Sequence, residues 1–142
     1  MAEINLDATN AVFGRLASYA AKQALLGNKV NILNVEKAVF SGNSDFIKSS
    51  YHHATTTRGQ VNYGPYISRM PDRFFRRVLR GMLPHKRAKG KAAYERLLCY
   101  IGVPESFKGK KLERLKHADL SNLKVPKYVS LGEVCKAIGG RV

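Results

Sequence analysis

The start of the chain contains the pattern that most constrains its fold. The segment EINLDA alternates Ile4 and Leu6 with polar neighbours, which is typical of a strand. Residues 14–26 (GRLASYAAKQALL) then place small and aliphatic side chains along one face of an expected helix. Residues 29–35 (KVNILNV) predict a second strand. A helix between two strands favours a right-handed crossover, so the sequence predicts an α/β fold with a parallel sheet.

The rest of the chain is expected to contain further strands and helices. Strands are expected at 38–40 and 99–103, helices at 45–51, 71–83 and 92–98, and loops at 52–68 and 84–91. Residues 128–131 are expected either to pair locally as a strand or to start a helix that includes Ile138. After Pro104 the leucines become sparse and five Lys/Arg occur between Lys108 and Lys116. We therefore expect one domain, with a core at residues 1–104 and a basic C-terminal extension at 105–142 that lies on the core or on a partner.

Residues 69–91 (RMPDRFFRRVLRGMLPHKRAKGK) carry more than half of the net charge of +15. They contain nine Lys/Arg and one acid, Asp72. Two sets of side chains alternate from Pro71 onward at the period of a helix. The apolar set is Phe74, Phe75, Val78, Leu79 and Met82, and the basic set on the opposite half is Arg73, Arg76, Arg77 and Arg80. One face is suited to a core, and the other is suited to an anionic partner.

A solvated face of mixed charge is the ordinary explanation for a charged helix. Here the charge has a single sign, so the arginines repel each other unless a polyanion or salt screens them. The guanidinium group also matches phosphate bidentately and stacks on bases. The chain has no run of 18 apolar residues and no signal-peptide or lipidation pattern, which disfavours a membrane as the partner.

The sequence predicts no catalytic, cofactor or metal site and no small-molecule substrate. The first strand–helix turn contains neither GxGxxG nor GxxxxGK[ST]. His52 and His53 are adjacent and no acids are spaced to complete a site with them, and Asp7 is expected as a turn residue. Cys99 and Cys135 lack metal-ligand spacing and are interpreted as buried thiols in a reducing cytosol.

Several basic segments separated by loops favour a folded RNA over a duplex DNA, which a dimeric reader usually contacts through one recognition helix. An enzyme acting on nucleic acid or nucleotides and a general chromatin-type DNA binder remain as alternatives. The residues that we expect to bind RNA are Lys48, Arg58, Arg69, Arg73, Arg76, Arg77, Arg80, His85, Lys86, Arg87, Lys89, Lys91, Lys108, Lys110 and Lys111.

Two motifs, GRLAS at 14–18 and LRGMLPHK at 79–86, resemble the universal large-subunit ribosomal protein thirteen family in its compact archaeal form. NILNVEKAVFSGN at 31–43 and YERLLCYIGVP at 94–104 follow the same order, so the resemblance covers most of the chain. It implies a three-layer α/β/α fold with a four-stranded parallel sheet. It also implies a non-enzymatic role in the cytoplasm as a constituent of the large ribosomal subunit, with large-subunit ribosomal RNA and neighbouring ribosomal proteins as partners. Arg80 to Lys91 would then form part of the RNA-facing surface.

Overall fold

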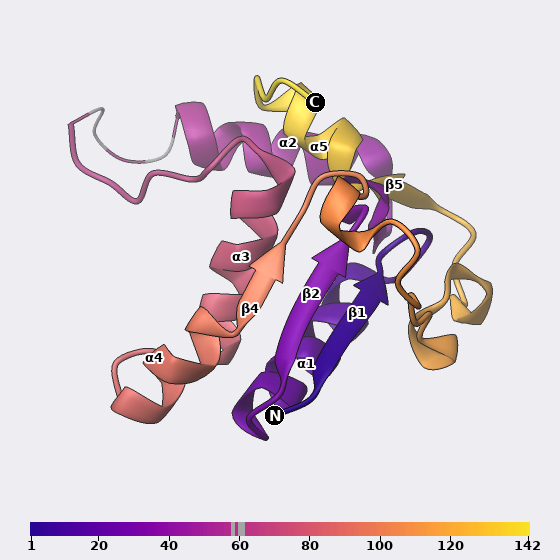
Figure 1. Ribbon diagram of the computed structural model, residues 1–142. Coiled ribbons are helices and arrows are strands. Elements are labelled where there is room, and N and C mark those ends of the chain that lie inside the picture. Colours follow the sequence, from indigo (N-terminus) through magenta and orange to yellow (C-terminus); the bar gives the residue numbers. More distant parts are fainter. Residues whose placement is uncertain (58, 60–61) are drawn as a thin grey trace.

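The computed structural model describes residues 1–57, 59 and 62–142. Its main sheet has three parallel strands in the order β1-β2-β4. These strands are β1 (Glu3–Asp7), β2 (Lys29–Leu33) and β4 (Leu97–Cys99). Helix α1 (Phe13–Leu25) connects β1 to β2 and lies behind these two strands in Figure 1. The predicted strand–helix–strand unit, the α/β class and the parallel sheet are therefore confirmed.

The expectation of a four-stranded parallel sheet is wrong. Strand β3 (Val39–Ser41) pairs antiparallel with β5 (Tyr128–Ser130) in a separate two-stranded sheet. After β2, Asn34 takes a left-handed φ of 55° and the 3-10 turn η1 (Val35–Lys37) redirects the chain, so β3 does not continue the main sheet.

The outer edge of β1 carries a one-residue bridge in place of a fourth strand. The backbone N–H of Glu113 donates to the carbonyl oxygen of Asn5 at 2.8 Å, and the N–H of Asp7 donates to that of Glu113 at 3.0 Å. The segment after β4 thus returns to the opposite edge of the sheet from β4.

The other elements surround this sheet. They are α2 (Ser44–Thr56), α3 (Pro71–Met82), α4 (Ala88–Glu95), α5 (Leu131–Ala137) and the 3-10 turns η2 (Glu105–Phe107), η3 (Lys116–Ala118) and η4 (Leu120–Asn122). Helices α2 and α5 lie beyond the carboxyl ends of the strands, while α4 lies near the opposite end (Figure 1).

Two helices extend into segments that were expected as loops. Helix α2 runs to Thr56, and the Thr55 and Thr56 hydroxyls donate to backbone carbonyl oxygens one turn back, an arrangement that a helix tolerates. Helix α4 begins at Ala88, inside the predicted loop 84–91, and ends before Leu97 and Leu98, which belong to β4. At Gly90 an added Cβ would lie 2.0 Å from the carbonyl oxygen of Pro84, so only glycine lets α4 pack on that turn.

The two faces of the main sheet differ in polarity. Leu6, Ile32 and Leu97 belong to the buried core that includes α1 and α3. On the other face the fully buried Asn31 side chain donates to Glu3 Oε1 at 2.8 Å and to Asn5 Oδ1 at 2.9 Å. The segment that contains η2 crosses this second face, where Lys110 Nζ lies 3.9 Å from Glu3 Oε1.

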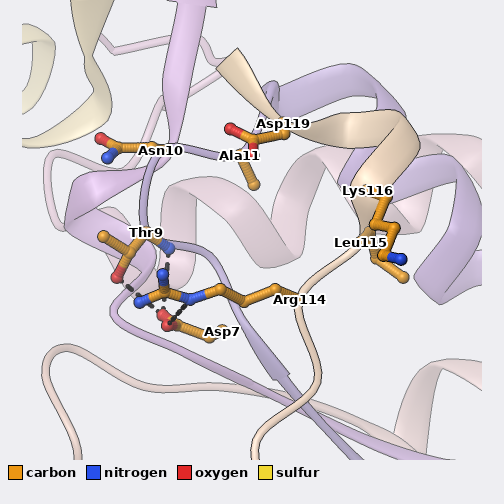
Figure 2. A pocket seen from close by; sticks show the side chains of 8 residues that line it. All are labelled: Asp7, Thr9, Asn10, Ala11, Arg114, Leu115, Lys116 and Asp119. Carbon is orange, nitrogen blue, oxygen red and sulfur yellow. Dashed lines mark hydrogen bonds and ion pairs between the residues drawn. The ribbon is translucent and has the colours of Figure 1, made fainter. Parts of the chain in front are cut away.

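The C-terminal segment is fastened at the carboxyl end of β1. Arg114 Nε donates to Asp7 Oδ2 at 2.9 Å, and this pair joins residues that are 107 positions apart in the sequence (Figure 2). Leu131 and Cys135 of α5 belong to the same buried cluster as the residues of α1 and β2. Residues 105–142 therefore contribute to the core as well as to the surface.

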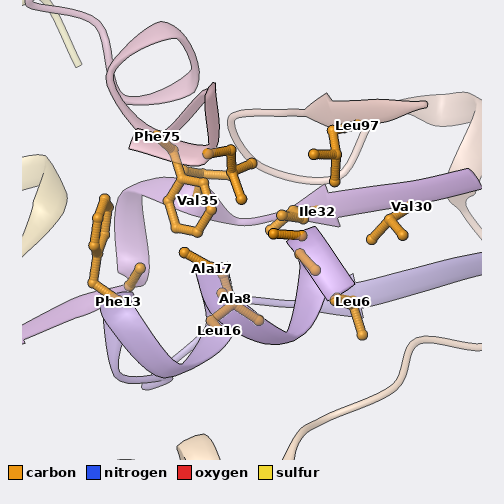
Figure 3. Packing of buried hydrophobic residues seen from close by; sticks show 14 of the residues in the cluster. Leu6, Ala8, Phe13, Leu16, Ala17, Val30, Ile32, Val35, Phe75 and Leu97 are labelled. Atoms are coloured by element: carbon orange, nitrogen blue, oxygen red, sulfur yellow. The ribbon is translucent and has the colours of Figure 1, made fainter. Parts of the chain in front are cut away.

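Side chains of α1, β2, η1 and α3 meet in the core shown in Figure 3. The Phe13 ring stacks on Phe40 with a centroid distance of 4.4 Å and lies 4.6 Å from Phe75. Of the apolar set predicted for α3, Phe74, Phe75 and Leu79 are buried, and Met82 remains 42% exposed at the end of the helix. The core fixes the orientation of α3 and leaves Arg73 and Arg80 exposed on the opposite half of the helix.

Candidate nucleic-acid interface

Helix α3 presents its arginines to a surface without anionic partners. Pro71 occupies the first turn, where its missing N–H costs no intrahelical hydrogen bond. Arg73 and Arg80 are exposed, and among the described residues neither has a hydrogen bond or an ion pair. They are two helical turns apart on the same face, which places their Cα atoms about 10 Å apart along the axis. Both guanidinium groups are available to an external anion.

Arg76 and Arg77 have a different role. Both are half-buried. Arg76 Nε donates to the carbonyl oxygen of Leu97 at 3.1 Å, and its guanidinium carbon lies 4.5 Å from the centroid of the Tyr94 ring. Arg77 Nη1 donates to the carbonyl oxygen of Tyr66. These two arginines hold α3 to β4, to α4 and to the segment before α3, while their charge remains at the surface.

A groove of about 370 Å³ lies along this face of α3. It is lined by Tyr66, Ser68, Arg73, Arg76, Arg77, Arg80 and Tyr94. Guanidinium groups, a hydroxyl and aromatic rings are the groups that bind phosphate and stack on unpaired bases. The groove is therefore chemically suited to a strand of nucleic acid.

The basic surface continues across the turn between α3 and α4. A hollow of about 190 Å³ is lined by Leu83, Pro84, His85, Lys86 and Arg87. His85 is half-buried, and the exposed cations of this part are Lys86, Arg87, Lys89 and Lys91. In the described part of the chain none of the four forms an ion pair. We refer to Arg73, Arg76, Arg77, Arg80, Lys86, Arg87, Lys89 and Lys91 as the basic surface.

The other cations predicted to bind RNA lie elsewhere or are paired. Lys48 Nζ lies 3.5 Å from Glu133 Oε2. Lys108 and Lys110 lie 3.6 Å and 3.9 Å from the carboxylates of Glu105 and Glu3. The segment that contains Lys108 and Lys110 pairs with the β1 edge of the main sheet at Glu113, whereas α3 packs against β4 at the other edge. The remaining positions are Lys111, which is exposed, Arg69, which is exposed beside Gly139, and Arg58, which lies outside the described residues.

The sequence interpretation missed the charged cluster at Asp7. The Asp7 side chain is only 7% exposed, and its Oδ1 accepts hydrogen bonds from the Thr9 N–H, the Thr9 hydroxyl and Asn34 Nδ2. Burial opposes ionisation of this carboxyl, but the bonds from Thr9, Asn34 and Arg114 outweigh it and lower the pKa of Asp7 to about 2. We call these four residues the Asp7 junction.

The junction borders a pocket of about 160 Å³ at the carboxyl end of β1, a position where α/β sheets often bind ligands (Figure 2). The oxygens of Asp7 are already engaged by four donor groups of the chain. The arrangement therefore serves to join β1, β2 and the C-terminal segment. The place of Asp7 near the end of the expected first strand was a sequence signal for it.

The described residues also bear on metal binding, thiol chemistry and membrane spanning. They contain no group of three or more His, Cys, Asp or Glu side chains able to hold a metal ion. Cys99 and Cys135 are free, and burial raises the pKa of both thiols to about 12, which makes them poor nucleophiles. No helix in the same part of the chain is long and apolar enough to span a bilayer.

Comparison with known proteins identifies the family of this chain. The model of the family described as ribosomal protein L13 matches residues 2–106. A protein of Methanosarcina barkeri named large ribosomal subunit protein uL13 is 42% identical over 137 residues, which cover 96% of this chain and 97% of the relative. Proteins of the same name from Archaeoglobus fulgidus and Methanopyrus kandleri are 40% and 43% identical and cover 96% and 94% of this chain and 87% and 85% of their own. The resemblance suggested by GRLAS and LRGMLPHK is thereby confirmed, and the chain belongs to the ribosomal protein L13 family.

Proposed function

We propose that this chain binds large-subunit ribosomal RNA through the basic surface on α3, α4 and the turn between them. As a member of its family, the chain is a structural constituent of the large ribosomal subunit in the cytoplasm and not an enzyme. The contribution of this particular surface is our inference from its geometry.

The observation that carries the proposal is unpaired charge on a rigid support. Four arginines emerge from one helix whose other face is fixed by Phe74, Phe75 and Leu79 in the core. When RNA binds such a surface, condensed counterions are released from the RNA and the entropy rises. Neutralisation by salt ions alone does not give this favourable entropy. Because the core holds α3 in place before binding, little entropy is lost in ordering this surface when RNA binds.

Within this surface we assign two tasks. Arg73, Arg80, Lys86 and Arg87 supply charge to phosphates, because all four are exposed and unpaired among the described residues. Arg76 and Arg77 shape the groove through their bonds to backbone carbonyl oxygens. Lys89 and Lys91 on α4 and half-buried His85 extend the surface.

The residues outside this surface form a second, weaker group of proposed contacts. Lys48, Arg69, Lys108, Lys110 and Lys111 are proposed to contact more distant RNA or neighbouring ribosomal proteins. Arg58 belongs to the same group by its charge alone. We also propose that residues 1–104 and 105–142 act as one domain, since β5 pairs with β3 and α5 enters the core.

The experiment compares binding to large-subunit ribosomal RNA with binding to duplex DNA of equal length over a range of salt concentrations. We expect the RNA to be preferred, with a log–log salt slope of roughly −0.7 to −0.9 for each phosphate neutralised. Equal affinity for the two polymers would instead favour a general DNA binder. Turnover of either polymer that is lost in a His52→Ala variant would contradict a purely structural role.

A further inference from the structure

We propose that one RNA strand crosses α3 at Gly81, and that this glycine is the point at which the RNA backbone comes closest to the protein backbone. The inference rests on the proposed function and adds the place and the geometry of the contact.

The fold itself gives no reason for a glycine at position 81. Apart from the helix backbone and the chain neighbours, no heavy atom lies within 4 Å of the position that a Cβ would take. The φ of Gly81 is not in the left-handed region that favours glycine. A glycine inside a helix weakens it relative to alanine, because glycine loses more backbone entropy on folding. The chain therefore carries a helix-weakening residue that its own packing does not require.

Gly90 provides the contrast within the same basic surface. There an added Cβ would lie 2.0 Å from the carbonyl oxygen of Pro84 and 2.8 Å from the N of His85. The chain itself occupies the space beside Gly90, whereas the space beside Gly81 is open. If that space has an occupant, it comes from outside the chain.

The surroundings of Gly81 indicate what that occupant is. Gly81 continues the row that begins with Arg73 and Arg77 at spacings of four residues, and it is exposed. Arg80, its neighbour, lines the groove of about 370 Å³, and Leu83, two residues further on, lines the hollow of about 190 Å³. Gly81 thus lies in the sequence between residues of two hollows that both contain cationic side chains, and it carries no side chain itself. A polyanionic strand that contacts both hollows can approach the backbone at Gly81.

The backbone at Gly81 also offers a specific hydrogen-bond acceptor. It lies in the last turn of α3, where carbonyl groups have no intrahelical donor. The residue four positions on is His85, whose N–H donates to Leu83 instead. In the described part of the chain the Gly81 carbonyl therefore has no partner. A ribose 2′-hydroxyl is a donor that RNA has and DNA lacks, so a contact here favours RNA.

The test uses Gly81→Ala and Gly81→Leu, with Gly14→Ala as the matched control. Gly14 is also an exposed helical glycine without neighbours within 4 Å, but it lies on α1. Alanine at either position is expected to raise the melting temperature by roughly 3 °C, since it removes the glycine penalty. Affinity for large-subunit ribosomal RNA is expected to fall only in the Gly81 variants, reaching about tenfold for leucine because a bulky side chain forces a packed contact apart. The salt slope should stay at the wild-type value, because no phosphate contact is lost.

A Gly81→Leu variant that binds this RNA as tightly as the wild type would overturn the inference. The proposed function would still hold in that case, because it requires only that the wild-type protein bind the RNA. An equal loss in Gly14→Ala would also overturn it, since the effect would not be local. So would a shallower salt slope in the Gly81 variants, because it would indicate lost charge contacts. A second readout uses single 2′-deoxy substitutions in the RNA fragment that the protein protects. At one nucleotide the substitution should lower the affinity of the wild-type protein, and it should leave the affinity of Gly81→Leu unchanged. Equal sensitivity of the two proteins would contradict the carbonyl contact.

Discussion

The Asp7 junction and the basic surface use charged side chains in opposite ways. At the junction a buried carboxylate is matched by donors from three parts of the chain, including Arg114 from the C-terminal segment. On the basic surface, Arg73 and Arg80 have no anionic partner among the described residues. The first arrangement stabilises the fold and is complete without a partner. In the second arrangement Arg73 and Arg80 contribute little to the fold, and their charge is matched only when an anion binds.

The strongest test of this difference separates Arg73 and Arg80 from Arg76 and Arg77. Replacing Arg73 and Arg80 by alanine should lower the affinity for large-subunit ribosomal RNA by at least about 100-fold, since each charged hydrogen bond contributes about 1.5–3 kcal/mol. The salt slope should become shallower by roughly 1.4 to 1.8. The melting temperature should not change, because neither side chain has a partner in the described residues. Filter binding and thermal melts provide both measurements.

The Arg76→Ala/Arg77→Ala double variant is the matched control. It removes the same charge but also the bonds to the carbonyl oxygens of Leu97 and Tyr66. We expect it to lose stability as well as affinity. If instead the Arg73 and Arg80 variant were the less stable of the two, the division between charge supply and groove support would be wrong.

The sequence was sufficient for features that depend on local periodicity. The alternation around Ile4 and Leu6 and the helical stripe of α1 predicted the β1-α1-β2 unit. The 3.6-residue spacing of Phe74, Phe75 and Leu79 correctly separated the buried face of α3 from its arginine face. A helix or strand that packs on the core along its whole length needs an apolar residue in every turn or at every second position, so its buried face is visible in the sequence.

Features that depend on a single distant partner could not be predicted in this way. The left-handed Asn34 removes β3 from the parallel sheet, and the bridge at Glu113 involves one residue. Arg76 and Arg77 were assigned to RNA by their charge and helix face, because their carbonyl partners lie 21 and 11 residues away. Asp7 was interpreted as a turn residue, since nothing local marks Arg114 as its partner. A single contact between two residues that are distant in the sequence does not repeat along the chain, so it produces no periodic pattern.

The junction predicts the reverse outcome for Asp7→Ala. Removing the carboxylate leaves the Asn34 amide and the Arg114 guanidinium without their acceptor at the end of β1. We expect the free energy of unfolding to fall by about 2–3 kcal/mol, because the fold loses its hydrogen bonds to a charged group and each such bond contributes about 1.5–3 kcal/mol. Asp119→Ala changes an exposed acid on the rim of the same pocket and should stay within about 0.5 kcal/mol. Urea denaturation measures both changes. Equal effects of the two substitutions would show that the junction is not special.

The acid dependence of stability tests the same carboxylate by titration. Its pKa of about 2 in the folded protein lies below the ordinary value of 3.8. The ionised form is therefore favoured by folding, and its contribution is present above about pH 4 and is lost as the pH falls towards 2. The contribution is about 2 kcal/mol. The difference in unfolding free energy between the wild type and Asp7→Asn should shrink over this window. A difference that is constant from pH 5 to pH 2 would contradict the lowered pKa.

Lys48 is a paired cation outside both regions, and it gives the smallest expected effect. It was predicted to bind RNA, yet its ammonium lies 3.5 Å from Glu133 Oε2 on α5. Both side chains are partly exposed, so the pair should stabilise the fold by less than about 0.5 kcal/mol. We expect Lys48→Ala to lower the affinity for large-subunit ribosomal RNA by less than about threefold, since a cation that already has a counter-charge releases few additional counterions. Glu133→Gln separates the two possibilities, because it frees the lysine without removing it. A steeper salt slope in Glu133→Gln would show that Lys48 reaches RNA once released, and an unchanged slope would leave it with the paired charges of the fold.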